Sequence, residues 1–116
     1  MKAIKEQTIL ITGATDGIGK ITAQRLAGMD ATVLLHGRDR GKGEATLAEI
    51  GAETGNNRLR YYHADLTDLT TVRKLAADVK ADRDHLDVLI NNAGVGPGPS
   101  SHTARESSRD GYELRF

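Results

Sequence analysis

The sequence contains no cysteine and no tryptophan, and aromatic residues make up only 3% of its 116 residues. The absence of cysteine excludes disulfides, thiolate metal sites and a cysteine nucleophile, and it fits a reducing compartment. The shortage of aromatic rings argues against a surface that stacks nucleic-acid bases. Basic and acidic residues number 16 each, so the net charge is zero and indicates neither a nucleic-acid partner nor an acidic membrane surface.

Long apolar runs are also missing. No segment approaches the roughly 20 consecutive apolar residues that a membrane-spanning helix needs. Residues 1–7 contain two lysines and a glutamate and lack the apolar stretch of a secretory signal. We therefore expect a soluble, cytoplasmic protein with no membrane partner. The length of 116 residues predicts one domain, 1–116, with a modest core.

Short apolar runs rich in β-branched residues alternate with segments of helical periodicity. The expected strands are residues 8–12, 31–36, 59–64 and 86–91, and the expected helices are residues 18–29, 40–54 and 69–83. This alternation is typical of βαβ units, so it predicts an α/β fold with a doubly wound parallel sheet and right-handed crossovers. The pattern ends at residue 94, and the glycines, prolines and polar residues that follow predict a loop.

Each expected helix carries apolar residues at helical spacing, and these predict its buried face. They are Ile18, Ile21, Leu26 and Met29 on the first helix, Ala45, Leu47, Ala48 and Ile50 on the second, and Leu69, Val72, Leu75, Ala76 and Val79 on the third. Thr67 or Asp68 is the expected N-cap of the third helix, because both residue types accept hydrogen bonds from helix N–H groups.

A glycine-rich turn joins the first strand to the first helix. Residues 12–19 read Thr-Gly-Ala-Thr-Asp-Gly-Ile-Gly. Glycines at this spacing let the backbone approach a pyrophosphate closely, and the start of the following helix adds its positive dipole end. The alternative is a loop that merely packs a helix tightly on a strand. The strand before the turn and the helix after it favour a dinucleotide-binding turn.

The second strand ends at His36-Gly37-Arg38, about 20 residues after the turn, where a dinucleotide fold meets the adenosine ribose. An acidic residue there would favour NAD. Arg38 can instead pair with a 2′-phosphate through two N–H donors, although a solvated loop arginine is the alternative. Arg40 and Lys42 could assist this phosphate contact, but we interpret them as surface charges. His36 could contact the cofactor, but we interpret it as a partly exposed loop histidine.

Polar and small residues also follow the other two strands. Asp65 and Leu66 come after the third strand, where the carboxylate could accept a hydrogen bond from an adenine amino group or could serve only as a turn or helix-capping residue. Residues 91–94 read Asn-Asn-Ala-Gly after the fourth strand. Small residues there would let a ligand lie against the backbone. The Asn-Asn-Ala-Gly sequence is weak evidence for a ligand site when taken alone. It is strong evidence here, because the ends of the three preceding strands also carry residues that suit a ligand.

Together, residues 12–19, Asp65-Leu66 and residues 91–94 resemble the short-chain dehydrogenase/reductase family over nearly the whole chain. Residues 17–20, 37–39 and 110–114 are similar to its retinol-dehydrogenase-like branch. The resemblance implies a Rossmann-like sheet of about four strands in the order 3-2-1-4 with three helices, incomplete relative to the family. It also implies an NAD(P)(H)-dependent oxidoreductase that transfers hydride between the nicotinamide and a small carbonyl or secondary alcohol.

The resemblance further implies which residues hold the dinucleotide. Residues 13–19 and Arg38 would bind the pyrophosphate and adenosine ribose, Asp65-Leu66 would frame adenine, residues 92–94 would follow the nicotinamide ribose, and residues 95–110 would form a substrate-side loop. Asp16 stands where many NADP-preferring relatives carry a basic residue, but Arg38 still favours NADP(H) over NAD. The implied cofactor-binding residues are Gly13, Ala14, Thr15, Asp16, Gly17, Ile18, Gly19, Arg38, Asp65, Leu66, Asn92, Ala93 and Gly94.

The family's chemistry needs a proton-donating tyrosine with a lysine four residues later, and this pair is absent. Asp65, Leu66 and Phe116 stand four residues after the three tyrosines. The four histidines match no metal-binding spacing. We therefore assign no catalytic or metal-ligating residue, and we expect the chain to supply only the cofactor-binding half and to be inactive alone.

Two other interpretations of the sequence remain open. The chain could be a non-catalytic dinucleotide-binding or interaction module, or a fragment from a curtailed reading frame. The expected exposure of the fourth strand is relevant to both interpretations. In the family's strand order Val88, Leu89 and Ile90 would form an exposed apolar edge here. We expect the chain to be marginally stable unless it forms a homo-oligomer or belongs to a longer polypeptide.

Overall fold

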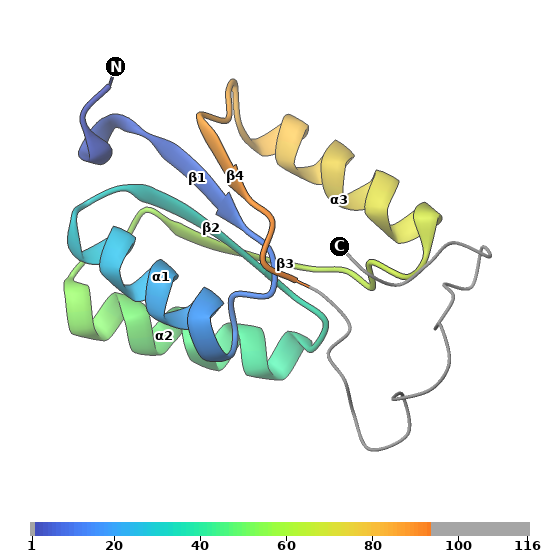
Figure 1. Cartoon of the computed structure of the whole chain (residues 1–116), viewed down its shortest axis with the longest axis horizontal. Helices are drawn as coiled ribbons and strands as arrows, with labels where there is room; N and C mark the ends of the chain where they lie inside the picture. Colours follow the sequence, from blue (N-terminus) through green and yellow to red (C-terminus); the bar gives the residue numbers. More distant parts are fainter. Residues whose placement is uncertain (1, 94–116) are drawn as a thin grey trace.

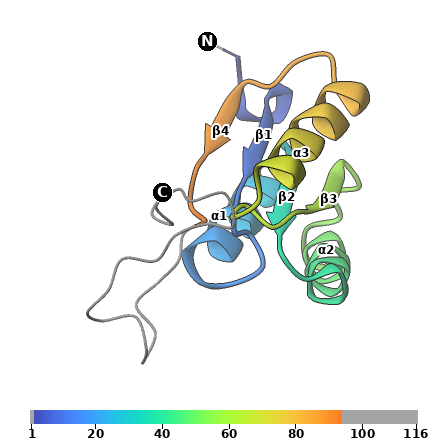
Figure 2. The ribbon, with the colours of Figure 1, turned by 90° about the vertical axis from the view of Figure 1, so that its right-hand side faces the viewer.

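The structure is a computed structural model and describes residues 2–93. In this part of the chain four parallel strands form one sheet in the order β3-β2-β1-β4, which confirms the predicted topology. Figure 2 shows β4, β1, β2 and β3 side by side across the sheet. The strands are β1 (Thr8–Ile11), β2 (Thr32–Gly37), β3 (Leu59–His63) and β4 (Val88–Ile90), and the helices are α1 (Gly17–Gly28), α2 (Arg40–Thr54) and α3 (Leu69–Asp82).

These bounds lie within two residues of those expected from the sequence. The short 3-10 helix η1 (Ile4–Glu6), which precedes β1, was not predicted from the sequence. Gly94 and the predicted substrate-side loop, residues 95–110, lie outside the described residues.

Helices cover the sheet on both faces. In Figure 1, α1 and α2 lie together on one face and α3 lies on the other. Because side chains alternate along a strand, β1 serves both layers: Ile9 and Ile11 pack toward α1 and α2, whereas Leu10 packs toward α3. The same alternation in β2 places Val33 and Leu35 in the first layer and Leu34 in the second.

The predicted apolar face of α1 is wrong at three of its four residues, and only Leu26 packs against the core. Ile18, Ile21 and Met29 are 76%, 51% and 55% exposed. The buried residues of the helix, at a spacing of four, are Gly19, Ala23 and Ala27. Small residues let the helix axis come close to the sheet, and a Cβ on Gly19 would lie only 2.2 Å from the Gly13 carbonyl oxygen. Close packing of α1 against the glycine turn therefore decides which face of the helix is buried, although the larger apolar side chains lie on another face.

The other two helices follow the prediction more closely. On α2, Ile50 is buried and Leu47 packs against the core, but Ala45 and Ala48 are exposed. On α3 the buried residues Leu75 and Val79 lie on the predicted stripe, whereas Ala76 is exposed.

The N-cap of α3 is Asp68, one of the two residues that were predicted for this position. Its side chain accepts a hydrogen bond from the Thr70 N–H at 2.9 Å. This bond satisfies one of the N–H groups that the first helical turn leaves without a backbone partner.

The edge strand β4 leaves apolar side chains exposed. It pairs with β1 on one side, and within the described part of the chain no strand pairs with its other side. Leu86, Val88 and Leu89 are 40%, 36% and 56% exposed. The exposed apolar edge expected from the sequence is therefore present at Val88 and Leu89. Ile90, the third residue expected there, is partly buried and packs against the core.

We predict that Gly19→Ala lowers the free energy of unfolding by about 1–3 kcal/mol, because the new methyl group collides with backbone in a packed interface. Gly28→Ala in the same helix is the matched control. No atom lies within 4 Å of its added Cβ, so its effect should be at most about 1 kcal/mol and in the stabilising direction. Urea unfolding measures both, and equal losses of stability would contradict the packing argument.

Candidate functional site

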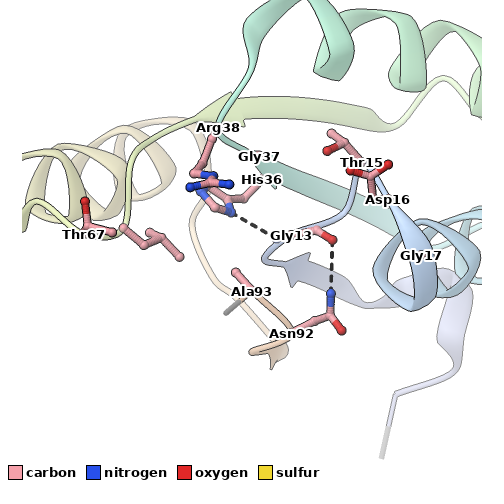
Figure 3. A pocket seen from close by; sticks show the side chains of 11 residues that line it. Gly13, Thr15, Asp16, Gly17, His36, Gly37, Arg38, Thr67, Asn92 and Ala93 are labelled. Atoms are coloured by element: carbon pink, nitrogen blue, oxygen red, sulfur yellow. Dashed lines mark hydrogen bonds between the residues drawn. The ribbon is translucent and has the colours of Figure 1, made fainter. Parts of the chain in front are cut away.

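The carboxyl ends of the strands meet at one edge of the sheet and surround a pocket of about 280 Å³. Parallel pairing aligns these ends, so residues far apart in the sequence come together there. Figure 3 shows residues from the ends of β1, β2 and β4 facing this space. The lining residues are Gly13, Thr15, Asp16, Gly17, His36, Gly37, Arg38, Leu66, Thr67, Asn92 and Ala93.

The glycine turn forms one wall of the pocket, and two of its glycines adopt conformations that disfavour other residues. Gly13 and Gly17 have φ values of 63° and 52°. A Cβ on Gly13 would lie 3.0 Å from the Ala93 Cα, so the two strand ends touch through backbone. No atom lies within 4 Å of a Cβ added to Gly17. Open space thus begins where α1 starts, with its first-turn N–H groups at the edge of the pocket.

Thr12 ties the glycine turn to the end of β4. Its buried hydroxyl accepts the N–H groups of Asn92 at 3.0 Å and Ala93 at 2.9 Å. The Asn92 side chain returns a bond from Nδ2 to the Gly13 carbonyl oxygen at 3.1 Å, drawn in Figure 3. Thr12 Oγ1 also lies 3.3 Å from Asn91 Oδ1, which agrees with the structural role expected for Asn91. These bonds fix the distance between two walls of the pocket.

His36 joins the glycine turn to the end of β3. Its Nδ1 accepts the Gly13 N–H at 3.2 Å, and its Nε2 lies 2.9 Å from the Ala64 carbonyl oxygen (Figure 3 shows the first bond). Since a carbonyl can only accept and an N–H can only donate, both bonds require the neutral ring with its proton on Nε2. Burial lowers the pKa of His36, and the nearby charges of Arg38 and His63 lower it further.

The expectation of a partly exposed loop histidine at this position is therefore wrong, because His36 lies within β2 and is 1% exposed. The polar ring tolerates burial because both of its nitrogens are paired with backbone groups. A histidine after three apolar residues does not by itself reveal such partners, since they come from the ends of two other strands.

Charged residues stand at the rim of the pocket. Arg38 follows β2 directly and is exposed, and Figure 3 places it beside His36 and Gly37. Asp16 occupies the N-cap position of α1, yet its side chain makes no capping bond. Its carboxylate instead pairs with the ammonium group of Lys42 from the first turn of α2. Lys42 is thus an ion-pair partner of a pocket residue, which the sequence interpretation as a surface charge did not include.

The pocket contains most of the residues expected to bind the cofactor but not four that the structure describes: Ala14, Ile18, Gly19 and Asp65. Ala14 is fully buried in the core beneath the turn. Ile18 is exposed, and Gly19 packs against the turn itself. The Asp65 carboxylate accepts bonds from the N–H and the hydroxyl of Thr67 at 2.9 and 2.6 Å, the turn role considered as the alternative.

Three lining residues were not among the expected set: His36, Gly37 and Thr67. Gly37 is required by close contacts, because a Cβ there would lie 2.6 Å from the Tyr61 hydroxyl and 2.9 Å from Thr15 Cγ2. Thr67 enters the pocket through the turn that Asp65 stabilises. An Asp followed two residues later by Thr is a turn signal in sequence, but it does not show which side of the turn faces a ligand.

The two described tyrosines pack under helices and do not line this pocket. Tyr61 donates to the Asp39 carbonyl oxygen at 2.7 Å, and Tyr62 donates to the Asp82 carboxylate at 2.7 Å. Burial raises the pKa of Tyr61, and burial together with Asp82 raises the pKa of Tyr62 to about 12. Both hydroxyls therefore stay protonated at neutral pH. Tyr112 lies outside the described residues.

Two features are absent from residues 2–93, a metal-binding cluster and a membrane-spanning helix. No group of three or more histidine, aspartate or glutamate side chains there is arranged to hold a metal ion. In the same part of the chain, no helix has the length and apolar character needed to cross a membrane.

Residues 7–114 match the family model described as short chain dehydrogenase. Retinol dehydrogenase 11 of Mus musculus is 46% identical over 107 residues, which cover 92% of this chain and 32% of that protein. Retinol dehydrogenase 13 of Homo sapiens is 40% identical over 113 residues, 97% of this chain and 33% of that protein. The chain thus spans about a third of the length of these relatives.

A solved structure of a short chain dehydrogenase from Shigella flexneri, complexed with NADP, superposes with a TM-score of 0.71. It is 34% identical, and the match covers 78% of this chain and 38% of that one. These findings confirm the resemblance to the family and to its retinol-dehydrogenase-like branch.

His36 predicts how stability depends on pH. Its lowered pKa means that the unfolded chain binds a proton on this ring at a higher pH than the folded chain does. Stability is therefore complete above the ordinary histidine pKa of about 6.5 and falls as the pH drops below it, by up to about 1.4 kcal/mol per pH unit until the folded-state pKa is reached. His36→Asn should remove this dependence between pH 7 and 5.

The matched control is His63→Asn, at an exposed position on the neighbouring strand. It should keep most of the dependence of the wild-type chain, because burial, and not the charge of His63, is the largest cause of the lowered pKa of His36. Urea unfolding at a series of pH values measures both variants, and a slope that survives in His36→Asn would show that another group titrates.

Proposed function

We propose, since the chain belongs to the short chain dehydrogenase family, that it forms the cofactor-binding part of an NAD(P)(H)-dependent oxidoreductase. The observation that carries the proposal is the convergence of the glycine turn, Arg38 and the Asn92-Ala93 backbone on one pocket at the carboxyl ends of the strands. This is the place where open parallel sheets bind ligands. The pyrophosphate would lie against the glycine turn and the start of α1.

The pocket has backbone walls where a dinucleotide would need close approach. Gly13, Gly17 and Gly37 line it without side chains, and Ala93 adds only a methyl group. The Thr12 and His36 bonds hold these walls at fixed separations before any ligand arrives. Such preorganisation lowers the entropic cost of binding. His36 occupies the Gly13 N–H through its ring and the Ala14 N–H through its carbonyl oxygen, so the pyrophosphate would meet the later N–H groups of the turn.

We propose NADP(H) as the preferred cofactor because of Arg38. Its guanidinium stands at the pocket rim after β2, where the adenosine ribose would lie, and it can bind a 2′-phosphate through two N–H donors. The similar Shigella flexneri structure is complexed with NADP, which supports the same preference. For the protein that carries this chain, we propose hydride transfer between the nicotinamide and a carbonyl or secondary alcohol, the reaction type that the names of the retinol dehydrogenases indicate.

Calorimetric titration of the chain with NADPH and with NADH tests the proposal. We predict saturable binding of NADPH and a preference over NADH. Arg38→Met should weaken NADPH binding about 10- to 100-fold, the loss expected when one strong charge-assisted contact disappears, and should change NADH binding little.

Arg25→Met is the matched control, since Arg25 is exposed in the last turn of α1, at the end of the helix opposite the glycine turn. It should leave both affinities unchanged. A folded chain that binds neither dinucleotide would refute the proposed function. A preference that survives Arg38→Met would refute the role of Arg38 only.

A further inference from the structure

The hydroxyl group of Tyr61 lies against the chain segment that carries Arg38. It donates a hydrogen bond to the Asp39 carbonyl oxygen at 2.7 Å. A Cβ added to Gly37 would lie 2.6 Å from the same hydroxyl oxygen, so the hydroxyl also stands directly beside the residue before Arg38. A single side chain from β3 thus contacts both neighbours of the arginine at the end of β2.

Packing holds the Tyr61 ring in this place. The residue is half-buried and packs against the core layer under α1 and α2. A Cβ on Gly43 would lie only 1.9 Å from Cζ, the ring carbon that carries the hydroxyl, so the ring lies against the backbone of α2 where only a glycine leaves room. The hydroxyl can therefore move away from the Arg38 segment only if the whole ring leaves its packed position.

The glycine turn holds the same segment from the opposite side. A Cβ on Gly37 would lie 2.9 Å from Cγ2 of Thr15, a residue of the pocket wall. The Gly37 carbonyl oxygen also accepts the Ala64 N–H at 3.0 Å. Gly37 is thus enclosed between Thr15 and the Tyr61 hydroxyl, and Figure 3 shows it next to Arg38 at the pocket.

The backbone at this point matters because the Arg38 side chain has two directions open to it. Arg38 lines the cofactor pocket, but it also lines a second groove of about 530 Å³ between α2 and α3, across the outer edge of β3. That groove holds the carboxylates of Glu44, Asp65 and Asp78, which attract a guanidinium. A fixed backbone at Arg38 limits how far the side chain can turn toward them.

We propose that Tyr61 is a positioning residue for dinucleotide selectivity: its hydroxyl fixes the backbone on both sides of Arg38 and so keeps the guanidinium at the rim of the cofactor pocket. This inference rests on the proposed function, because it concerns the same dinucleotide. Tyr61 does not line the cofactor pocket, so it acts through Arg38 and not by touching the ligand. A planar guanidinium binds a phosphate through two donors only when it is correctly oriented. The effect of Tyr61 is therefore confined to ligands that carry the 2′-phosphate.

Tyr61→Phe tests the proposal, because it removes the hydroxyl and keeps the packed ring. The Asp39 carbonyl oxygen also accepts the Gly43 N–H at 3.0 Å, the first backbone bond of α2. It therefore keeps a partner in the variant, and α2 begins at the same residue. The dissociation constants of NADPH, NADH and adenosine 2′,5′-bisphosphate are measured by calorimetry, and urea unfolding verifies that the variant is folded.

Tyr62→Phe is the matched control. Tyr62 is the next residue of β3, and its hydroxyl also donates at 2.7 Å, but to the Asp82 carboxylate at the end of α3 on the opposite face of the sheet. Asp82 keeps Arg60 as a partner at 3.4 Å when this hydroxyl is removed. The control thus deletes the same chemical group from the same strand at a place remote from Arg38.

Tyr61→Phe should weaken binding of NADPH and of adenosine 2′,5′-bisphosphate about three- to tenfold, the range of one hydrogen bond. It should change NADH binding less than about twofold, whereas a general loss of structure would weaken all three ligands. Tyr62→Phe should leave all three affinities unchanged. In the Arg38→Met background, Tyr61→Phe should weaken NADPH no further, because the group through which it acts is already gone.

Four results would overturn the inference. Equal weakening of NADPH and NADH would show that Tyr61 has only a structural role, and unchanged affinities would show that Arg38 does not need its hydroxyl. A further loss in the Arg38→Met background would show that Tyr61 acts independently of Arg38. A wild-type chain that binds NADPH with any of these three outcomes leaves the proposed function intact. A folded wild-type chain that binds neither dinucleotide overturns both proposals.

Discussion

Parallel pairing of β1 with β2 on one side and β4 on the other is the constraint on which the candidate site depends. Ile11, the last residue of β1, lies opposite Leu35 and Ile90, so the segments that follow all three strands emerge at one edge. The pocket exists because these three segments and the one that follows β3 leave the sheet together, although tens of residues separate most of them in the sequence. The helices have to cover both faces of the sheet, and they therefore leave this edge uncovered.

Side chains behind the pocket hold these segments in register beyond the ends of the strands. Thr12 bonds the glycine turn to the Asn92-Ala93 backbone, and His36 bonds the same turn to the end of β3. Both side chains are buried, and they form hydrogen bonds with backbone groups that would otherwise have no partner. They explain why a turn with two left-handed glycines keeps one conformation: its neighbours on either side are tied to it by hydrogen bonds, and α1 packs against it without a Cβ at Gly19.

Charge at the rim follows from the fold more than from the composition. The chain is neutral overall, and Asp16 next to the glycine turn would by itself repel a phosphate. The first turn of α2 brings Lys42 to that carboxylate from 26 residues away. The net charge of the whole chain therefore does not decide the charge at the rim, because Coulomb interactions depend on the local distances between charges rather than on their total.

The strand order 3-2-1-4 was expected from the family resemblance. The sequence by itself determined the order of the elements along the chain, the parallel sheet and the place of the glycine turn. These features are local or follow from a rule: periodicity shows strands and helices, and alternation with short connections allows few topologies. The buried residues Leu75 and Val79 of α3 were predicted correctly for the same reason, although Ala76 on the same predicted stripe is exposed.

Only the tertiary structure decided which side of α1 is buried, how His36 is satisfied and what Lys42 contacts. Each depends on the distance between segments remote in sequence. The close approach of α1 buries Ala23 and Ala27 in place of Ile18 and Ile21. The partners of His36 come from two other strand ends, and the partner of Lys42 comes from the glycine turn. Hydrophobic periodicity records how a segment divides its own surface, but it carries no record of which neighbour meets that surface or how closely.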